Sequence, residues 1–272
     1  MGYQKGSITL SARQDIPLLL QVLHSRFITH DQLFEFMLLG CYELKRASFN
    51  WRVRRLVEGE LLHRQCARPV TPSPVYSITS VGALMLAEHC PVLDSKRKEE
   101  DTSHVQVAHS IGLNDLHLSL ARQGILEGWQ SEMAIRATNE LTPSGYVKDY
   151  DAIVTIRIDG QPLFFALEYE RTPKESKRYL RIRSMLEREY RVHYFLYIVP
   201  ERSLASFILD CFAGTTAALF VGLAADFNRS LKDMDVTEAS SGQTRPIIQA
   251  LALSDGFAVT SPRLRRESSA RQ

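Results

Sequence analysis

The chain has 272 residues, of which 44% are hydrophobic and 24% are charged, and its formal net charge is +2. This length allows one large globular domain or two modest ones. The small net charge excludes binding of nucleic acid through overall charge alone, so the positions of the basic residues matter. No apolar stretch is long enough to span a bilayer, and residues 1–10 lack the apolar core of a signal peptide, so we expect a cytoplasmic protein without membrane contact.

The four cysteines lie far apart and form no CxxC pair. Scattered thiols in a reducing compartment behave as small buried hydrophobes, so we expect no disulfides. His63 with Cys66 and His89 with Cys90 have side chains that zinc accepts, and we regard a zinc site there as the weaker interpretation.

Three helices are predicted before residue 60. Residues 16–23 are apolar enough for a buried helix. A second helix is predicted over residues 30–39, with Thr29 as its N-cap and Gly40 at its C-terminus. A third, amphipathic helix is predicted over residues 47–59, because its apolar side chains recur on one face.

Two short strands and a further helix follow. Residues 61–66 and 75–78 are strand-like and are separated by three prolines, and Thr79 is placed to cap a last helix. Three helices, a hairpin and a helix in this order predict a winged helix-turn-helix, in which the third helix enters the major groove of double-stranded DNA and the hairpin touches the backbone.

Basic and polar side chains gather in the third helix and the hairpin, where this interpretation needs them. The candidate DNA-binding residues are Lys45, Arg46, Ser48, Asn50, Arg52, Arg54, Arg55, Arg64 and Arg68. Two alternatives stay open: the arginines only solvate an exposed helix face, or the domain binds another protein.

A charged, apolar-free run over residues 94–103 separates this segment from the rest of the chain. We therefore divide the sequence into a DNA-binding domain (residues 9–92), a charged linker (93–103), an α/β domain (104–231) and a polar, weakly structured C-terminal region (232–272).

The α/β domain is predicted from alternating helix and strand patterns. A long helix is expected over residues 104–124, and two later helices are expected over residues 173–190 and 203–212. Strands are expected over residues 129–135, 150–158, 162–169, 192–199 and 217–223, with a hairpin turn at residues 159–160. This order indicates helices packed on a mixed sheet, in an α+β or α/β protein.

Acidic residues inside these strands need an explanation, because a buried unpaired carboxylate is costly. Glu132, Asp151, Glu168 and Glu170 are in this position. Glu168 and Glu170 share a strand face, and Asp151 lies one hairpin away, so these three would converge. Such a cluster suits Mg²⁺, which in nucleases polarises the scissile phosphate.

The ordered motifs resemble a known family. A helix, W-x-x-E at 129–132, D-A at 151–152 and LEYERT at 167–172 are similar to the replication-relaxation family, and the likeness covers about residues 9–199, including YSITSVG at 76–82. Members occur with replication and mobilisation genes of plasmids and conjugative elements. The resemblance implies a winged helix joined to a domain similar to the PD-(D/E)XK nuclease fold.

The resemblance also implies roles for the acids. Glu132 would be the first acid of a catalytic set with Asp151, Glu168 and Glu170, and Asp151 and Glu168 would hold the metal. The sequence departs from the nuclease pattern where Glu170 replaces a lysine, and Arg171, Lys174 or Lys177 would have to supply the cation. Alternatively, the cluster binds metal or DNA without cutting, or its carboxylates form salt bridges with Arg171, Arg178 or Arg181.

The sequence thus favours a DNA-binding regulator or accessory factor of plasmid or mobile-element replication or mobilisation, which needs no cofactor to bind DNA. A Mg²⁺-dependent DNA endonuclease or nickase is the second hypothesis, and a module that binds a relaxase or a replication initiator is the third. A homodimer is the default expectation for a DNA reader.

Overall fold

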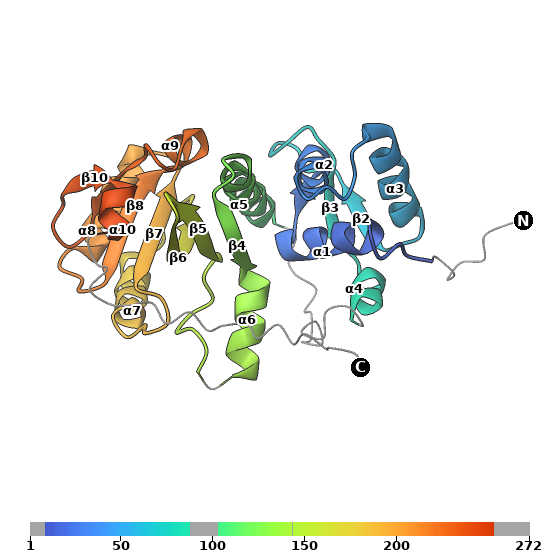
Figure 1. The fold of residues 1–272 in the computed structure, drawn as a ribbon. Coiled ribbons are helices and arrows are strands. Elements are labelled where there is room, and N and C mark those ends of the chain that lie inside the picture. The colour runs from blue at the N-terminus through green and yellow to red at the C-terminus, as the bar shows by residue number, and fades with distance from the viewer. Residues whose placement is uncertain (1–8, 88–102, 143, 253–272) are drawn as a thin grey trace, which may run out of the picture.

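The computed structural model describes residues 9–87, 103–142 and 144–252 of the chain. It is a mixed α+β structure in which a small helical part with a three-stranded sheet lies beside a larger part built on a seven-stranded sheet (Figure 1). No helix in the described ranges combines the length and the apolar character that a bilayer crossing requires.

The N-terminal part, residues 9–87, packs helices on a small antiparallel sheet in the order β1-β3-β2. Its elements are α1 (Asp15–Ser25), β1 (Ile28–Thr29), α2 (His30–Leu39), α3 (Arg46–Glu58), β2 (Leu62–Gln65), β3 (Val75–Ile78) and α4 (Ser80–Leu86). The predicted order of three helices, hairpin and helix is confirmed, and the two-residue strand β1 is an addition.

The predicted caps form as the sequence indicated. The Thr29 side chain accepts a hydrogen bond from the Gln32 backbone N–H, and the Gln32 side chain accepts one from the Thr29 N–H, so both ends of a capping box are present. Thr79 accepts from the Gly82 N–H at the start of α4. These bonds satisfy backbone donors that a helix N-terminus leaves without partners, and they set where α2 and α4 begin.

The larger part is a seven-stranded sheet with helices on both faces. Its elements are α5 (His104–Arg122), β4 (Leu126–Ser131), α6 (Glu132–Leu141), β5 (Ala152–Ile158), β6 (Gln161–Tyr169), α7 (Ser176–Leu186), β7 (Tyr194–Val199), α8 (Arg202–Phe212), β8 (Ala218–Leu223), α9 (Ala224–Arg229), β9 (Asp235–Glu238), β10 (Thr244–Pro246) and α10 (Ile247–Ala252). The sheet order is β10-β9-β8-β7-β6-β5-β4, with β6, β7 and β8 parallel and the other neighbours antiparallel.

Two hydrophobic clusters fill the two sides of this sheet. Leu116 and Leu120 of α5 pack on one face together with residues of α9 and α10, and Tyr179 of α7 and Ile208 of α8 pack on the other. The long β5–β6 hairpin turns at Asp159 and Gly160, which have φ of 51° and 82°. Positive φ at both central residues suits a tight hairpin, as the Asp-Gly pair predicted.

Helix α5 contacts both parts of the structure and lies between them in Figure 1. Leu118 joins the core of the N-terminal part, whereas Leu116 joins the core of the large sheet. The Asn114 side chain donates to the Phe27 carbonyl at 2.9 Å, and Gln32 donates to the Asp115 carboxylate at 2.7 Å. The two parts therefore share a packed and hydrogen-bonded contact along α5.

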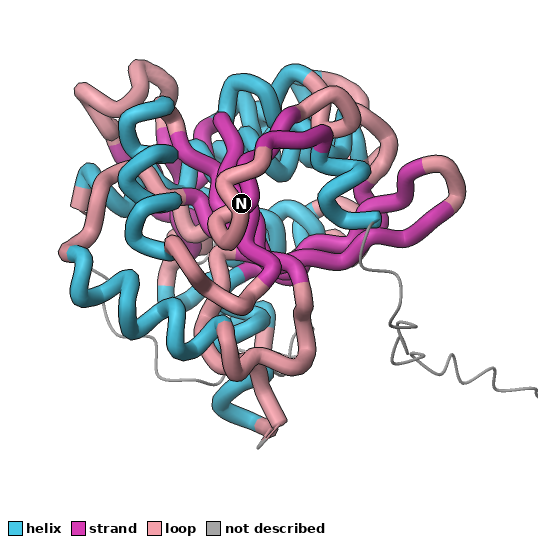
Figure 2. The backbone as a smooth tube through the Cα atoms, turned by 90° about the vertical axis from the view of Figure 1, so that its left-hand side faces the viewer, coloured by secondary structure: helices cyan, strands magenta, loops and turns pink. Residues whose placement is uncertain are grey.

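Two sequence predictions are corrected here. The strand expected over residues 129–135 ends at Ser131, whose hydroxyl accepts from the Ala134 N–H and so starts α6 at Glu132. The region from residue 232 was expected to be weakly structured, yet residues 235–252 form two strands and a helix, with β9 and β10 at the sheet edge. The side view in Figure 2 shows the strands running between helices. The predicted linker, apart from Ser103 at the start of α5, and residues 253–272 lie outside the described residues.

Candidate functional site

Helix α3 presents a row of polar side chains beside the β2–β3 hairpin. Arg46, Asn50 and Arg54 are exposed and recur at four-residue spacing, which places them along one side of the helix. The neighbouring side carries Phe49, Val53 and Leu56, which are buried in the N-terminal core. The amphipathic pattern therefore turns the row outward while anchoring the helix.

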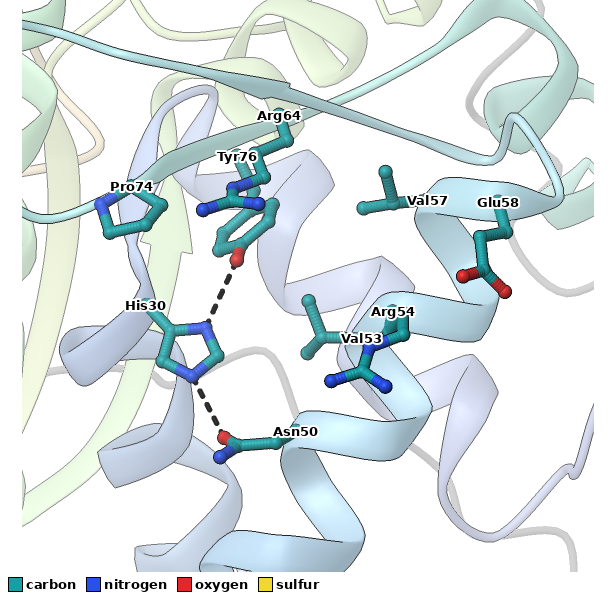
Figure 3. Close-up of a pocket in the computed structure, with 9 residues that line it drawn as sticks. All are labelled: His30, Asn50, Val53, Arg54, Val57, Glu58, Arg64, Pro74 and Tyr76. Carbon is teal, nitrogen blue, oxygen red and sulfur yellow. Dashed lines mark hydrogen bonds between the residues drawn. The ribbon is translucent and has the colours of Figure 1, made fainter.

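A groove of about 430 Å³ separates α3 from the hairpin. Asn50 and Arg54 form its wall on the α3 side, while Arg64 and Tyr76 line it from the hairpin and His30 from the start of α2 (Figure 3). The Arg64 side chain comes from β2, opposite Tyr76 of β3 in the antiparallel register. Helix and hairpin thus present their basic groups to the same space.

The groove contains a short chain of hydrogen bonds. His30 Nε2 is hydrogen-bonded to Asn50 Oδ1 at 2.9 Å. His30 Nδ1 is hydrogen-bonded to the Tyr76 hydroxyl at 3.1 Å. Burial lowers the pKa of His30, so the ring is neutral at pH 7. The ring also packs against Phe49 and Tyr76, which holds it in place.

Most of the predicted DNA-binding residues are exposed, but three are not free to reach outward. Arg52 is 8% exposed and donates to Asp15 and Glu43 inside the N-terminal part. Arg55 is half-buried and is also paired with Asp15, and the Ser48 hydroxyl donates to Glu43. The exposed members of the predicted set are Lys45, Arg46, Asn50, Arg54, Arg64 and Arg68. Arg52 is therefore corrected to a structural residue.

The predicted carboxylates of the large sheet meet as the strand pairing suggested. Asp151 directly precedes Ala152, which pairs with Leu167, so Asp151 lies across from Glu168. Asp151 Oδ2 accepts the Tyr169 N–H at 2.7 Å, and Oδ1 lies 3.2 Å from His109 Nε2. Both oxygens of this carboxylate are therefore engaged.

The other two acids of the cluster are paired with lysines. Glu168 and Glu170 are 7% and 6% exposed, and they accept hydrogen bonds from Lys148 and Lys174, respectively. Lys148 also lies 4.7 Å from the centre of the Tyr150 ring. The paired cations are lysines and His109, in place of the arginines that the sequence suggested.

Glu132 differs from Asp151 and Glu168 because it belongs to a helix. It begins α6, and its side chain accepts from Arg26 at 3.0 Å and from Arg136 at 2.8 Å. Its backbone N–H donates to the Asp151 carbonyl at 3.1 Å, which keeps the two residues adjacent. The expectation of a strand residue at Glu132 is therefore wrong.

Burial and local charge shift the pKa values in opposite directions. Burial and the neighbouring Asp151 raise the pKa of Glu168 to about 7, although Lys148 opposes the shift. Burial would raise the pKa of Asp151, but the charge and hydrogen bond of His109 hold it below its usual value. Burial would lower the pKa of His109, but Asp151 raises it.

The arrangement does not fit a divalent cation. Mg²⁺ needs several free oxygen ligands, whereas both Asp151 oxygens are engaged and Glu168 is paired with Lys148. Across residues 9–87, 103–142 and 144–252, no group of three or more His, Cys, Asp or Glu side chains is arranged to hold a metal. Of the weaker zinc set, His89 and Cys90 lie outside the described residues.

A second cavity of about 280 Å³ opens between α1 of the N-terminal part and the large sheet. Asp151 and Glu132 line it together with His24, Arg26 and His109. Neither His109 nor Lys148 is among the site residues that the sequence predicted. The contacts of His109 with Asp151 and of Lys148 with Glu168 have no short-range sequence signal, because the partners lie 42 and 20 residues apart.

The chain was compared with protein-family models, with curated proteins and with solved structures. None of the three comparisons found a match. The function must therefore be argued from the geometry of these two sites.

Proposed function

We propose that the protein is a DNA-binding factor that reads double-stranded DNA with α3 and the β2–β3 hairpin. The observation that carries this proposal is the exposed row of Arg46, Asn50 and Arg54 on α3, of which Asn50 and Arg54 face Arg64 across an open groove. Lys45, just before α3, and Arg68, after β2, are also exposed. Such surfaces neutralise phosphates and release counterions, which is the main source of affinity for DNA.

The order of elements supports a winged helix-turn-helix in this part of the chain. Helices α1, α2 and α3 precede the β2–β3 hairpin, and β1 completes a sheet in the order β1-β3-β2. The connection from α2 to α3 is short, running from Gly40 to Lys45. In this assignment α3 is the recognition helix and the hairpin is the wing.

For the larger part of the protein, we propose a nuclease-like fold that does not cleave DNA. The succession is α5-β4-α6-β5-β6-α7-β7, with β6 and β7 parallel, and apart from the additional helix α6 it agrees with the fold that the family resemblance implies. Its acids are occupied by Lys148, Lys174 and His109, so they favour a structural role over hydrolysis. We infer that this part supports the DNA-reading part through α5.

The resemblance to the replication-relaxation family suggests the setting. It places the chain with plasmid or mobile-element replication or mobilisation, as a cytoplasmic regulator or accessory factor. The basic groove supports DNA as the partner more directly than a relaxase or an initiator protein.

The test is a DNA-binding assay at several salt concentrations with purified protein. Arg54→Ala together with Arg64→Ala should weaken binding and reduce the slope of log K against log salt by about one for each lost phosphate contact. Arg181→Ala is the matched control, because Arg181 is exposed on α7, away from the groove. Absence of DNA binding by the wild-type protein would overturn the proposal and favour the protein-interaction module.

The same preparations should be incubated with supercoiled DNA and Mg²⁺, Mn²⁺ or EDTA. We expect binding without cleavage in every case. Cleavage that requires a metal and is lost in Asp151→Asn would overturn the non-enzymatic assignment and establish the endonuclease instead.

A further inference from the structure

The side-chain amide of Asn50 has a fixed orientation in the groove. Its carbonyl oxygen accepts a hydrogen bond from His30 Nε2 at 2.9 Å, because an amide oxygen cannot donate. A neutral ring that donates through Nε2 must accept through Nδ1, which lies 3.1 Å from the Tyr76 hydroxyl. Tyr76 therefore donates to His30, and His30 donates to Asn50.

The hydrogen bonds from Tyr76 to His30 and from His30 to Asn50 bias Asn50 toward donation, because a bond accepted at the oxygen polarises the amide and strengthens its N–H groups as donors. Figure 3 shows the Asn50 oxygen joined to the His30 ring by a hydrogen bond, with the amide nitrogen beside that oxygen. An asparagine with both groups free matches adenine, which offers one acceptor and one donor on its major-groove edge. The bond from His30 uses one of the two lone pairs of the Asn50 oxygen and turns that oxygen toward α2, so Asn50 offers adenine a weaker acceptor while both amide hydrogens stay available.

The neighbouring polar groups have the same character. Arg54 and Arg64 line the groove beside Asn50, and a guanidinium group donates but never accepts. Val53 and Val57 contribute apolar surface, and Glu58 is the one acidic side chain among the described residues that line the groove. Except near Glu58, the charged and amide groups of the groove offer hydrogen-bond donors.

We propose that this groove selects guanine, with Asn50 donating to its major-groove edge and His30 acting as the residue that positions Asn50. The inference rests on the proposed DNA binding and names the base that it reads. Guanine is the base that presents two acceptors, N7 and O6, in the major groove. Asn50 lies in the first half of α3, where a recognition helix reaches base edges.

The experiment begins with selection of bound sequences from random double-stranded DNA by the full-length protein. Wild-type protein should enrich a guanine at one position of the site. Replacing that guanine by 7-deazaguanine, which lacks the N7 acceptor, should weaken binding about tenfold, equivalent to about 1.4 kcal/mol for one base contact. In Asn50→Ala the same replacement should have no effect.

His30→Phe tests the positioning role. Phenylalanine retains a ring that can pack against Phe49 and Tyr76 but cannot donate to Asn50, so the Asn50 oxygen becomes free. The selected base should then shift from guanine toward adenine, a change that a loss of stability alone would not cause. Thermal unfolding checks that the variant is folded. Tyr76→Phe is a milder second variant, because it removes the hydroxyl donor to His30, and its selected base should shift in the same direction.

The outcomes separate the two proposals. No binding by the wild-type protein would overturn the proposed function itself. Binding without guanine enrichment, or without sensitivity to 7-deazaguanine, would overturn only the base assignment. Phosphate oxygens are acceptors as well, so the second probe is a methylphosphonate linkage next to the selected guanine. If this linkage weakens binding of wild-type protein but not of Asn50→Ala, while 7-deazaguanine is tolerated, Asn50 contacts the DNA backbone instead of the base.

Discussion

Arg52 Nη1 donates a hydrogen bond to Asp15 Oδ1 at 2.7 Å, between α3 and α1. Asp15 is fully buried and Arg52 is 8% exposed, so this ion pair belongs to the core of the N-terminal part. Burial would raise the pKa of Asp15, but hydrogen bonds from Arg55, Ser11 and Arg52 keep it below its usual value. A basic residue of α3 therefore fixes that helix from inside.

We expect Arg52→Ala to lower the free energy of unfolding by about 3–5 kcal/mol, because it leaves a buried carboxylate with one partner fewer. Urea denaturation measures this change. Arg54→Ala is the matched control two residues along the same helix, and as an exposed substitution it should stay within about 0.5 kcal/mol of wild type. Equal stability of the two variants would contradict the structural role of Arg52.

Gly82→Ala should also destabilise the N-terminal part. A Cβ at this position would lie 2.3 Å from the Leu61 carbonyl oxygen, so α4 and the chain entering β2 must separate. Overpacking of this kind costs about 1–3 kcal/mol, which differential scanning calorimetry would detect as a lower Tm. Gly128→Ala is the control, since its Cβ would meet Thr155 at 3.6 Å, an ordinary contact.

Asp151→Asn should lower the pKa of His109. The charge and hydrogen bond of Asp151 raise that pKa against the effect of burial, and asparagine removes the charge. Titration of the histidine ring resonances by NMR measures the shift directly. His117 is the internal reference, because burial lowers its pKa to about 3 and its resonances should not change between pH 5 and 8. An unchanged His109 titration would show that the two side chains are not coupled in solution.

Glu168→Gln should change how stability depends on pH. Burial raises the folded-state pKa of Glu168 to about 7, above its ordinary value of 4.5, so folding favours the protonated form. The contribution of Glu168 to stability is therefore fully present below pH 4.5 and is lost as the pH rises to about 7. Glutamine resembles the protonated acid and does not titrate.

The difference in free energy of unfolding between Glu168→Gln and wild type should thus move in favour of the variant from pH 4.5 to about 7 and then level off. Chemical denaturation at a series of pH values provides the curve. Glu187→Gln, at an exposed position where Arg183 holds the pKa low, should show no gain in this window. A difference that is constant with pH would contradict the assigned direction.

Local structure was largely predictable because its signals are short-range. The Thr29 and Thr79 caps, the Asp159-Gly160 turn and most helices and strands depend on residues within a few positions of each other. The error at Glu132 has the same origin, since an apolar pattern over residues 129–135 is compatible with a strand followed by a helix. The Ser131 cap decided between them.

The sequence by itself determined the elements, the grouping of basic residues in α3 and the hairpin, and the convergence of Asp151 with Glu168. Only the tertiary structure decided which of these groups are free to act. It buries Arg52 against Asp15, pairs Glu168 with Lys148, and orients Asn50 through His30. The reason is physical: periodicity determines which side of an element faces the core, whereas the partner of a polar side chain depends on contacts between segments far apart in the chain.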